Sequence, residues 1–100
     1  MKKPTPNKQL LKNIIFGTLG TNKDLQVFLF GSRAKGNPRP HSDIDIALLS
    51  NKPIALATMS LLREKIEEST IPYHVDIVDL ATVSSNFRDK VLKEGEKWTA

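Results

Sequence analysis

The sequence predicts one compact, layered domain of the α/β or α+β class. A chain of 100 residues has room for one domain. Its 39% hydrophobic and 26% charged residues are typical of a folded globular protein. Apolar residues at helical spacing alternate with short apolar runs that favour strands, in the order helix, strand, turn, strand, helix, strand, helix. We expect a flexible tail over residues 1–7 and a single domain over residues 8–100.

The first helix is expected over residues 8–19, where apolar residues recur every three or four positions. Asn7 is its candidate cap, and Gly20 is its candidate stop. A strand is expected over residues 25–30 because leucine, valine and phenylalanine dominate there. Since this strand is apolar on both faces, it should lie centrally in its sheet. Gly31 ends it.

The second strand follows a basic loop. Residues 32–36 are expected to form a short helical turn closed by a glycine, and the prolines of residues 37–40 exclude regular structure. A strand is then expected over residues 42–49. Alternation along it places Asp43 and Asp45 on one face and isoleucines on the other, which should pack on helices.

The remaining elements are a helix over residues 54–68, a strand over residues 73–80 and a helix over residues 82–94. Ser84 or Ser85 caps the last helix, and a glycine follows its end. The expected apolar stripes are Leu56, Met59, Leu62 or Arg63 and Ile66 on the second helix, and Phe87, Val91 and Leu92 on the last.

Asp43 and Asp45 are the candidate metal ligands. On one face of a strand they lie about 6.5–7 Å apart along the backbone. Their charges raise each other's pKa unless a cation neutralises them. All-oxygen ligation favours magnesium or manganese, and two such ions serve phosphoryl or nucleotidyl transfer. A solvated strand end also carries such pairs, so the neighbouring turn matters to the interpretation.

Gly31 and Ser32 are the candidate phosphate contacts. A glycine lets the backbone approach an anion closely, and a serine offers a hydroxyl and an N–H group. An ordinary strand-ending turn would look the same in sequence. Arg33 and Lys35 either bind phosphate or solvate the loop, and Arg33 is the better candidate because a guanidinium makes bidentate contacts.

A third carboxylate is expected if the site deprotonates an acceptor hydroxyl. Asp76 and Asp79 have opposite parity on the third strand, so only one of them can face the site. We prefer Asp76, because a charge between Val75 and Ile77 in mid-strand needs a reason. Asp79 could cap the turn that follows.

Composition excludes several kinds of site and partner. The chain has no cysteine, which removes disulfides and thiolate metal sites and is compatible with the cytoplasm. We see no secretory signal and no apolar run of membrane-spanning length. The net charge of +4 suits solubility or phosphate-bearing ligands. His41 and His74 are interpreted as surface or packing residues, and Trp98 as a cover for the core edge.

Gly31-Ser32, ten intervening residues and Asp43-x-Asp45 resemble the nucleotidyltransferase signature of the DNA polymerase β superfamily. Asp76 fits its third acidic position. The strings FGSRAKG and SDIDIALL, together with the size of the chain, resemble the minimal nucleotidyltransferases, stand-alone domains usually paired with a HEPN-domain protein. The core signature shows no departure from the family pattern.

The resemblance implies an α+β fold of two layers, with a small mixed sheet flanked by helices. It implies two magnesium ions on Asp43, Asp45 and Asp76, with Gly31 and Ser32 at the triphosphate. The reaction would transfer AMP from ATP to a partner HEPN toxin, so that this chain acts as an antitoxin.

Two other functions are compatible with the same residues. One is an antitoxin that binds nucleotide or partner without catalysis. The other is a small-molecule nucleotidyltransferase of the aminoglycoside kind, although no second domain to bind the acceptor is visible. The acceptor is therefore expected from another protein or from a second copy of this chain. Direct nucleic-acid binding ranks last, because no helix-turn-helix or basic aromatic surface is seen.

Overall fold

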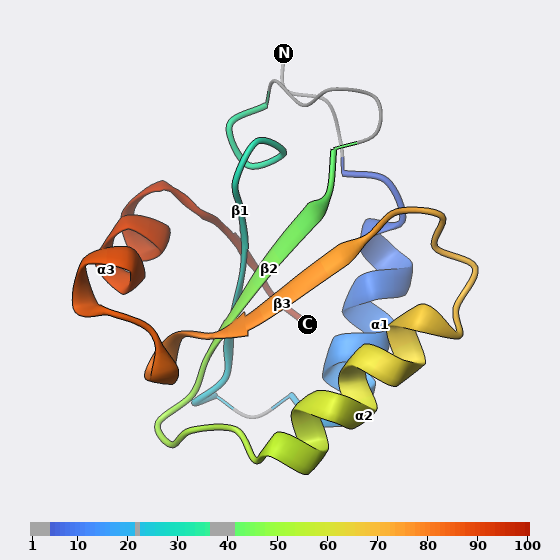
Figure 1. The fold of residues 1–100 in the computed structure, drawn as a ribbon, viewed down its shortest axis with the longest axis horizontal. Coiled ribbons are helices and arrows are strands. Elements are labelled where there is room, and N and C mark those ends of the chain that lie inside the picture. The colour runs from blue at the N-terminus through green and yellow to red at the C-terminus, as the bar shows by residue number, and fades with distance from the viewer. Residues whose placement is uncertain (1–4, 22, 37–41) are drawn as a thin grey trace.

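The fold class expected from the sequence is confirmed. A computed structural model shows a small mixed sheet flanked by helices (Figure 1). It describes residues 5–21, 23–36 and 42–100. Most of the expected tail, the proline-rich stretch and His41 lie outside these residues.

The sheet places the apolar first strand in its interior, as expected. The strand order is β3-β2-β1-β4. β1 pairs antiparallel with both β2 and β4, whereas β2 pairs parallel with β3. The strands are β1 (Gln26–Phe30), β2 (Ile44–Leu49), β3 (Val75–Asp79) and β4 (Glu96–Trp98).

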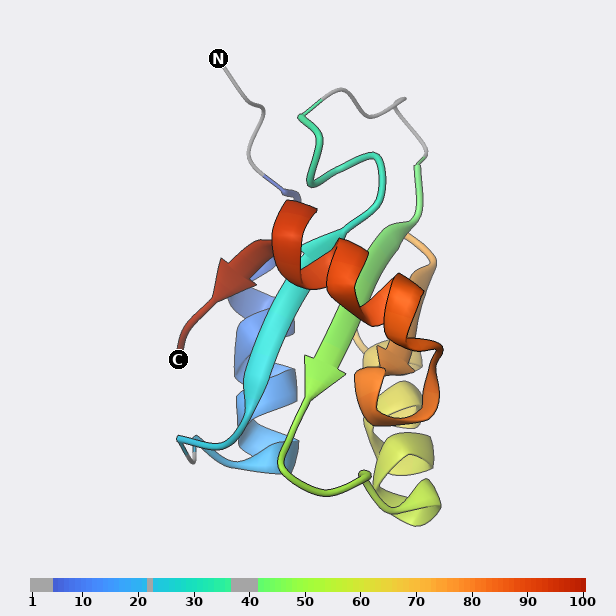
Figure 2. The same ribbon diagram turned by 90° about the vertical axis from the view of Figure 1, so that its left-hand side faces the viewer.

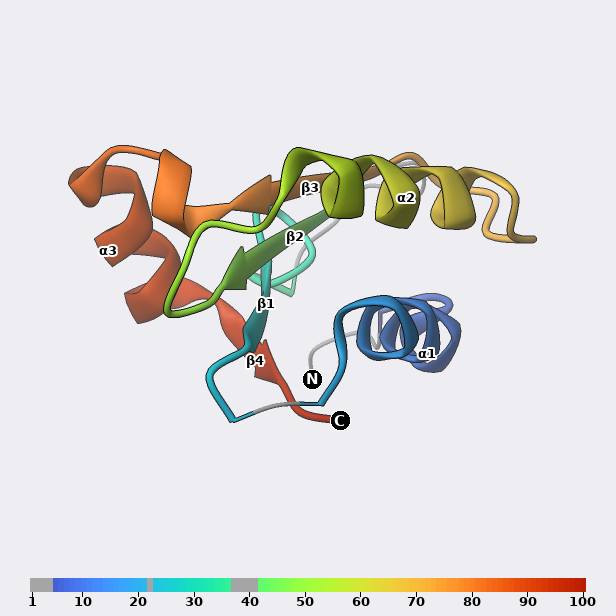
Figure 3. The same ribbon diagram turned by 90° about the horizontal axis from the view of Figure 1, so that it is seen from below.

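Helices cover both faces of this sheet. α1 (Lys8–Leu19) and α2 (Leu56–Glu67) lie side by side on one face, and α3 (Ser85–Glu94) lies on the other (Figure 3). A 3₁₀ turn, η1 (Leu80–Thr82), joins β3 to α3. Helix α3 thus adds a partial third layer. None of the described helices is both long enough and apolar enough to cross a bilayer.

Alternation along the strands divides the core in two. Ile44, Ile46 and Leu48 point toward α1 and α2 and are fully buried in the larger cluster. Phe28 and Ala47 point the other way and pack with α3 in a smaller cluster. Figure 2 shows α3 crossing this second face of the sheet. One strand can therefore hold a core with one face and present polar groups on the other.

The helix ends match the sequence except at Asn7. Gly20 ends α1 and donates its N–H to the carbonyl oxygen of Phe16. At the start of α3, the Ser84 hydroxyl accepts the N–H of Phe87. Asn7 precedes α1 as expected but makes no side-chain cap. It adopts a left-handed conformation (φ 59°), which turns the side chain away from the first helical N–H groups.

Two expectations about packing were wrong, and one strand was not predicted. Strand β4 was missed, since three residues carry no periodicity. Leu56 is 84% exposed because the first turn of α2 extends past the end of the sheet (Figure 1). Leu92 is 40% exposed because α3 buries a narrow stripe around Val91. Trp98 does cover the core, at 2% exposure.

Candidate functional site

The pairing of β2 with β3 brings two carboxylates together. In the parallel register Asp45 lies beside Asp76. Both stand on the face that carries α3, since Asp45 alternates with the buried Ile44 and Ile46. Asp43 lies just before β2 and is exposed. The structure thus gathers the three acids that the sequence singled out at the end of the sheet where β2 begins.

Asp79 belongs to the opposite side of β3 and is engaged in the fold. It is 6% exposed. Its Oδ2 accepts the N–H of Ile54 at 2.8 Å, and its Oδ1 accepts the N–H of Ala81 at 2.9 Å. These bonds anchor the segment before α2 and the 3₁₀ turn after β3. Of the two candidates for the third carboxylate, only Asp76 lies beside Asp45.

Gly31 lies directly against the Asp45 carboxylate. Its φ of 77° is a backbone conformation that residues with a side chain rarely adopt. A β-carbon at this position would also collide with Asp45 Oδ2 and come within 3.3 Å of its Cγ. The pairing of Phe30 with Asp45 across β1 and β2 fixes this approach. Glycine is therefore required here both by conformation and by space.

Residues 32–36 form a single helical turn that ends at Gly36, as expected. Lys35 donates its N–H to the carbonyl of Gly31 at 3.2 Å, and Gly36 donates to Arg33 at 3.3 Å. Gly36 then leaves the turn with a φ of 79°. Ser32 is exposed at the start of the turn. Its hydroxyl and the backbone beside it are thus open to a ligand next to Asp45.

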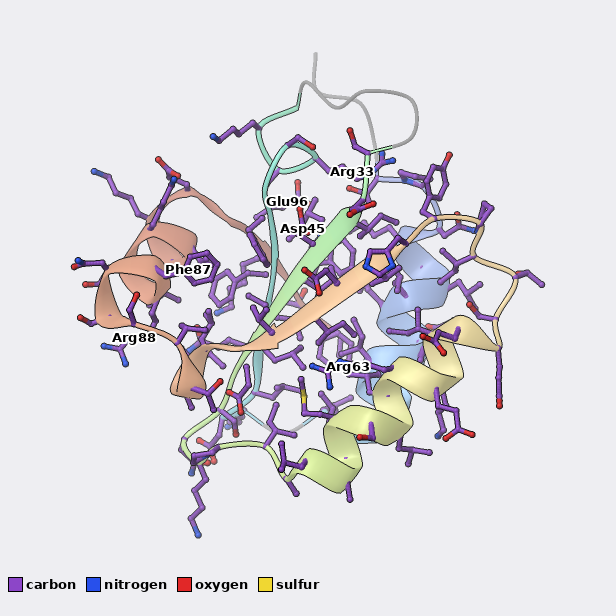
Figure 4. All side chains as sticks on the ribbon, in the orientation of Figure 1. Arg33, Asp45, Arg63, Phe87, Arg88 and Glu96 are labelled. Atoms are coloured by element: carbon purple, nitrogen blue, oxygen red, sulfur yellow. The ribbon has the colours of Figure 1, made fainter. Side chains whose placement is uncertain are left out.

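Arg33 points into the protein rather than out of the loop. It is only 6% exposed. Its Nε and Nη2 donate to the carbonyl oxygen of Ser42 at 3.0 and 2.7 Å. Its guanidinium carbon lies 4.8 Å from the centre of the Tyr73 ring. Figure 4 shows Arg33 and Asp45 at the same end of the sheet.

The carboxylates make this end of the sheet electrostatically unfavourable when they are all ionised. Burial raises the pKa of the Asp45 carboxyl above its ordinary value, and the charges of Asp76 and Asp43 raise this pKa further. His74 and Arg33 lower the same pKa. A bound cation would remove the repulsion among the carboxylates.

The donor set fits a magnesium ion that arrives with a phosphate ligand. Within the described ranges, no three acidic or histidine side chains already converge as a preformed metal site. Mg²⁺ is commonly held by one or two carboxylates together with substrate phosphates, so a complete protein cage is not needed. Asp43, Asp45 and Asp76 carry the hard carboxylate oxygens that Mg²⁺ prefers, and two of them, Asp43 and Asp76, are exposed.

Two cavities lie near this end of the sheet, and one of them includes a candidate carboxylate, Asp76. One cavity of about 110 Å³ lies between the Gly31 turn and α3. Two of its lining residues, Phe30 and Phe87, meet edge to face with their ring centres 5.6 Å apart. A wider one of about 420 Å³ lies along β3 and includes His74 and Asp76. The first is lined by Phe30, Gly31, Ala34, Lys35, Phe87, Lys90, Val91, Glu94 and Gly95.

Two residues of the site were not assigned to it from the sequence. His74 is exposed and close enough to Asp45 to affect its pKa. His74 is two residues before Asp76, and this spacing could have indicated from the sequence that both face the same side of the strand. Tyr73 stacks on Arg33, a contact across 40 residues that no local pattern indicates. Trp98 is not at this site, because its Nε1 donates to Glu96 within the core edge.

Comparisons with known proteins agree with this geometry. A family model described as "Polymerase beta, Nucleotidyltransferase" matches residues 13–98, a range that contains Gly31 and all three carboxylates. The probable protein adenylyltransferase MntA of Haemophilus influenzae is 40% identical over 70 residues. This alignment covers 70% of the present chain but only 61% of that relative.

Two solved complexes contain chains of similar structure. One is a toxin–antitoxin with AMP-PNP, at 30% identity and a TM-score of 0.67 over 89% of this chain and 73% of the other. The second is tri-AMPylated HEPN toxin from Shewanella oneidensis in complex with MNT antitoxin. That match has 29% identity and a TM-score of 0.62 over 93% of this chain and 73% of the other.

The different surroundings of Asp79 and Asp76 predict opposite effects on stability. Asp79→Ala should lower the free energy of unfolding by about 1–3 kcal/mol, since the N–H groups of Ile54 and Ala81 lose their acceptor in partly buried hydrogen bonds. Asp76→Ala should leave it unchanged or raise it slightly, because the exposed Asp76 repels Asp45. Urea unfolding of both variants measures this. Equal losses would contradict the assignment.

The raised pKa of Asp45 predicts that Asp45→Asn stabilises the metal-free protein at neutral pH. Because the folded-state pKa exceeds the unfolded-state value, this carboxyl favours folding at low pH and loses that contribution as the pH rises through the folded-state pKa. A gain of about 1 kcal/mol would raise Tm by roughly 4–8 °C.

Thermal unfolding in a chelator at several pH values checks this. The difference between Asp45→Asn and wild type should shrink as the pH falls, and added Mg²⁺ should stabilise the wild type more. Asp89→Asn, on the exposed side of α3, is the matched control. A variant that is less stable than wild type at pH 7 would show that ionised Asp45 does not strain the fold.

Proposed function

Since the chain belongs to the polymerase β-type nucleotidyltransferase family, we propose that it transfers AMP from ATP to a partner HEPN-domain protein and thereby acts as an antitoxin. The proposal is supported by a relative named as a probable protein adenylyltransferase and by a similar chain in a complex with tri-AMPylated HEPN toxin. AMP-PNP in another similar complex supports ATP as the donor.

The observation that carries this proposal is the register of the sheet. It sets Asp76 beside Asp45, while the pairing of β1 with β2 sets the Gly31 turn against the same carboxylate. The register thus supports a site in which Asp45, Asp76 and the Gly31 turn act together at one end of the sheet. This arrangement suits a nucleotide whose phosphates lie between the turn and the acids.

Each group has a role in that arrangement. Asp43, Asp45 and Asp76 would hold two magnesium ions together with phosphate oxygens. When bound, such ions neutralise charge on the phosphates and on the attacking and leaving oxygens. Gly31 and Ser32 would support the triphosphate through the backbone and the serine hydroxyl. Asp43 and Asp76 are exposed, which gives an acceptor on another protein access to the site.

The reaction is a substitution at the α-phosphorus of ATP. A hydroxyl oxygen of the partner forms a bond to this phosphorus, and the bond from it to the bridging oxygen of the β-phosphate breaks. Pyrophosphate leaves with that electron pair, and AMP stays on the partner. The hydroxyl proton is accepted by Asp76, an exposed carboxylate that lies beside Asp45.

Label transfer tests this function. With Mg²⁺ and a HEPN partner, α-labelled ATP should label the partner, whereas γ-labelled ATP should not. Asp43→Asn and Asp45→Asn should each reduce transfer by about 100-fold, since each removes a carboxylate charge from the site. Asp89→Asn, an equivalent change on the surface of α3, should transfer normally.

Two results would point to other functions. Labelling from γ-labelled ATP would indicate a kinase. Full neutralisation of the toxin by Asp45→Asn in the absence of transfer would indicate an antitoxin that acts by binding.

A further inference from the structure

Arg33 is a buried cation inside the loop that the sequence analysis assigned to nucleotide binding. Only 6% of it is exposed, although it lies in a turn between exposed Ser32 and Lys35. Burying an arginine is costly unless its donors are used. Here Nε and Nη2 form a fork on the Ser42 carbonyl, at 3.0 and 2.7 Å. These two hydrogen bonds help to explain how the guanidinium can be buried.

The contacts of Arg33 connect three segments that are distant in sequence. The arginine itself belongs to the Gly31 turn. Ser42 immediately precedes Asp43, and Tyr73, whose ring lies 4.8 Å from the guanidinium carbon, comes three residues before Asp76. These are the segments that supply the turn, the first carboxylate and the third carboxylate. One side chain therefore bridges all parts of the candidate site.

The same contacts leave Arg33 poorly placed to hold a phosphate. Two of its donor nitrogens are used within the protein, and one face of the guanidinium is covered by an aromatic ring. A phosphate would have to compete with a buried bidentate contact. Lysine cannot reproduce this geometry, because an ammonium group has neither the planar fork nor the flat face that stacks on a ring.

We propose that Arg33 is a positioning residue, which holds the Ser42–Asp43 segment and the start of β3 against the Gly31 turn so that the carboxylates face a common divalent cation. This proposal rests on the proposed nucleotidyl transfer for its functional meaning. It assigns to Arg33 the fixing of the metal-binding geometry in place of direct contact with ATP.

The test separates metal binding from nucleotide binding in Arg33→Lys. Mn²⁺ is titrated into the protein without nucleotide and followed by electron paramagnetic resonance, and AMP transfer is measured against ATP at saturating Mg²⁺. We expect the Kd for Mn²⁺ to rise about 10-fold and kcat to fall about 10–100-fold, as for other residues that orient ligands. KM for ATP should stay within about twofold of the wild-type value.

Arg88→Lys is the matched control. Arg88 lies on α3 and points away from the sheet (Figure 4). Its nearest charged contact is a loose one to Asp89 at 4.0 Å. This variant should bind Mn²⁺ and transfer AMP as the wild type does.

Variants of Tyr73 keep the proposal testable if Arg33→Lys unfolds. Tyr73→Phe retains the ring that contacts Arg33, so it should lose less Mn²⁺ affinity than a variant without the ring. Tyr73→Leu removes the ring and should weaken Mn²⁺ binding and kcat in the same sense as Arg33→Lys. The double variant should lose less than the product of the two single effects, because both disturb one contact. Thermal unfolding confirms that each variant is folded.

A rise in KM for ATP with unchanged Mn²⁺ affinity in Arg33→Lys would overturn the proposal and make Arg33 a phosphate ligand. The proposal would also be overturned if Tyr73→Leu bound Mn²⁺ as tightly as the wild type and had the same kcat. If the wild type itself transfers no AMP, the proposed function fails, but the Mn²⁺ titrations still decide the role of Arg33.

Discussion

The close approach of Gly31 to the Asp45 carboxylate is the constraint on which the rest of the site depends. It requires a residue without a β-carbon in a left-handed conformation, placed by the pairing of Phe30 with Asp45. The same Asp45 is held beside Asp76 by the parallel pairing of β2 and β3. In the proposed function, a nucleotide at the turn would therefore lie against the acids. The cost is a partly buried carboxylate among other acids: burial raises the pKa of Asp45, and the charges of Asp76 and Asp43 raise it further.

The fold tolerates this cost because the side chains of β2 alternate between two faces. One face packs in the hydrophobic core, and the other carries Asp45. Ile44, Ile46 and Leu48 are fully buried against α1 and α2 in the larger hydrophobic cluster. Asp45 stands on the other face, where the core is smaller and α3 covers only part of the sheet. Rigid packing behind the strand holds a carboxylate in place in front of it, as precise ligand geometry requires.

Local patterns predicted much of this architecture, and long-range contacts account for what they could not predict. Helical spacing identified α1, and two-residue alternation placed Asp45 on the face opposite the buried Ile44 and Ile46. Asp43, expected on the same strand, lies just before β2. Parity left Asp76 and Asp79 as alternatives, and the choice became clear only from the hydrogen bonds of Asp79 to Ile54 and Ala81. Strand β4 has three residues and depends on pairing with β1. The inward direction of Arg33 depends on a carbonyl nine residues away and on a ring forty residues away.

The central claim is that the acids beside the Gly31 turn form a site for a metal-bound triphosphate. Crystals grown with Mn²⁺ and a non-hydrolysable ATP analogue test it most directly through the anomalous scattering of manganese. The account predicts anomalous peaks in contact with Asp45 and Asp76, with the phosphates lying against Gly31 and Ser32. Manganese or phosphates bound elsewhere on the protein, with these carboxylates free, would contradict it.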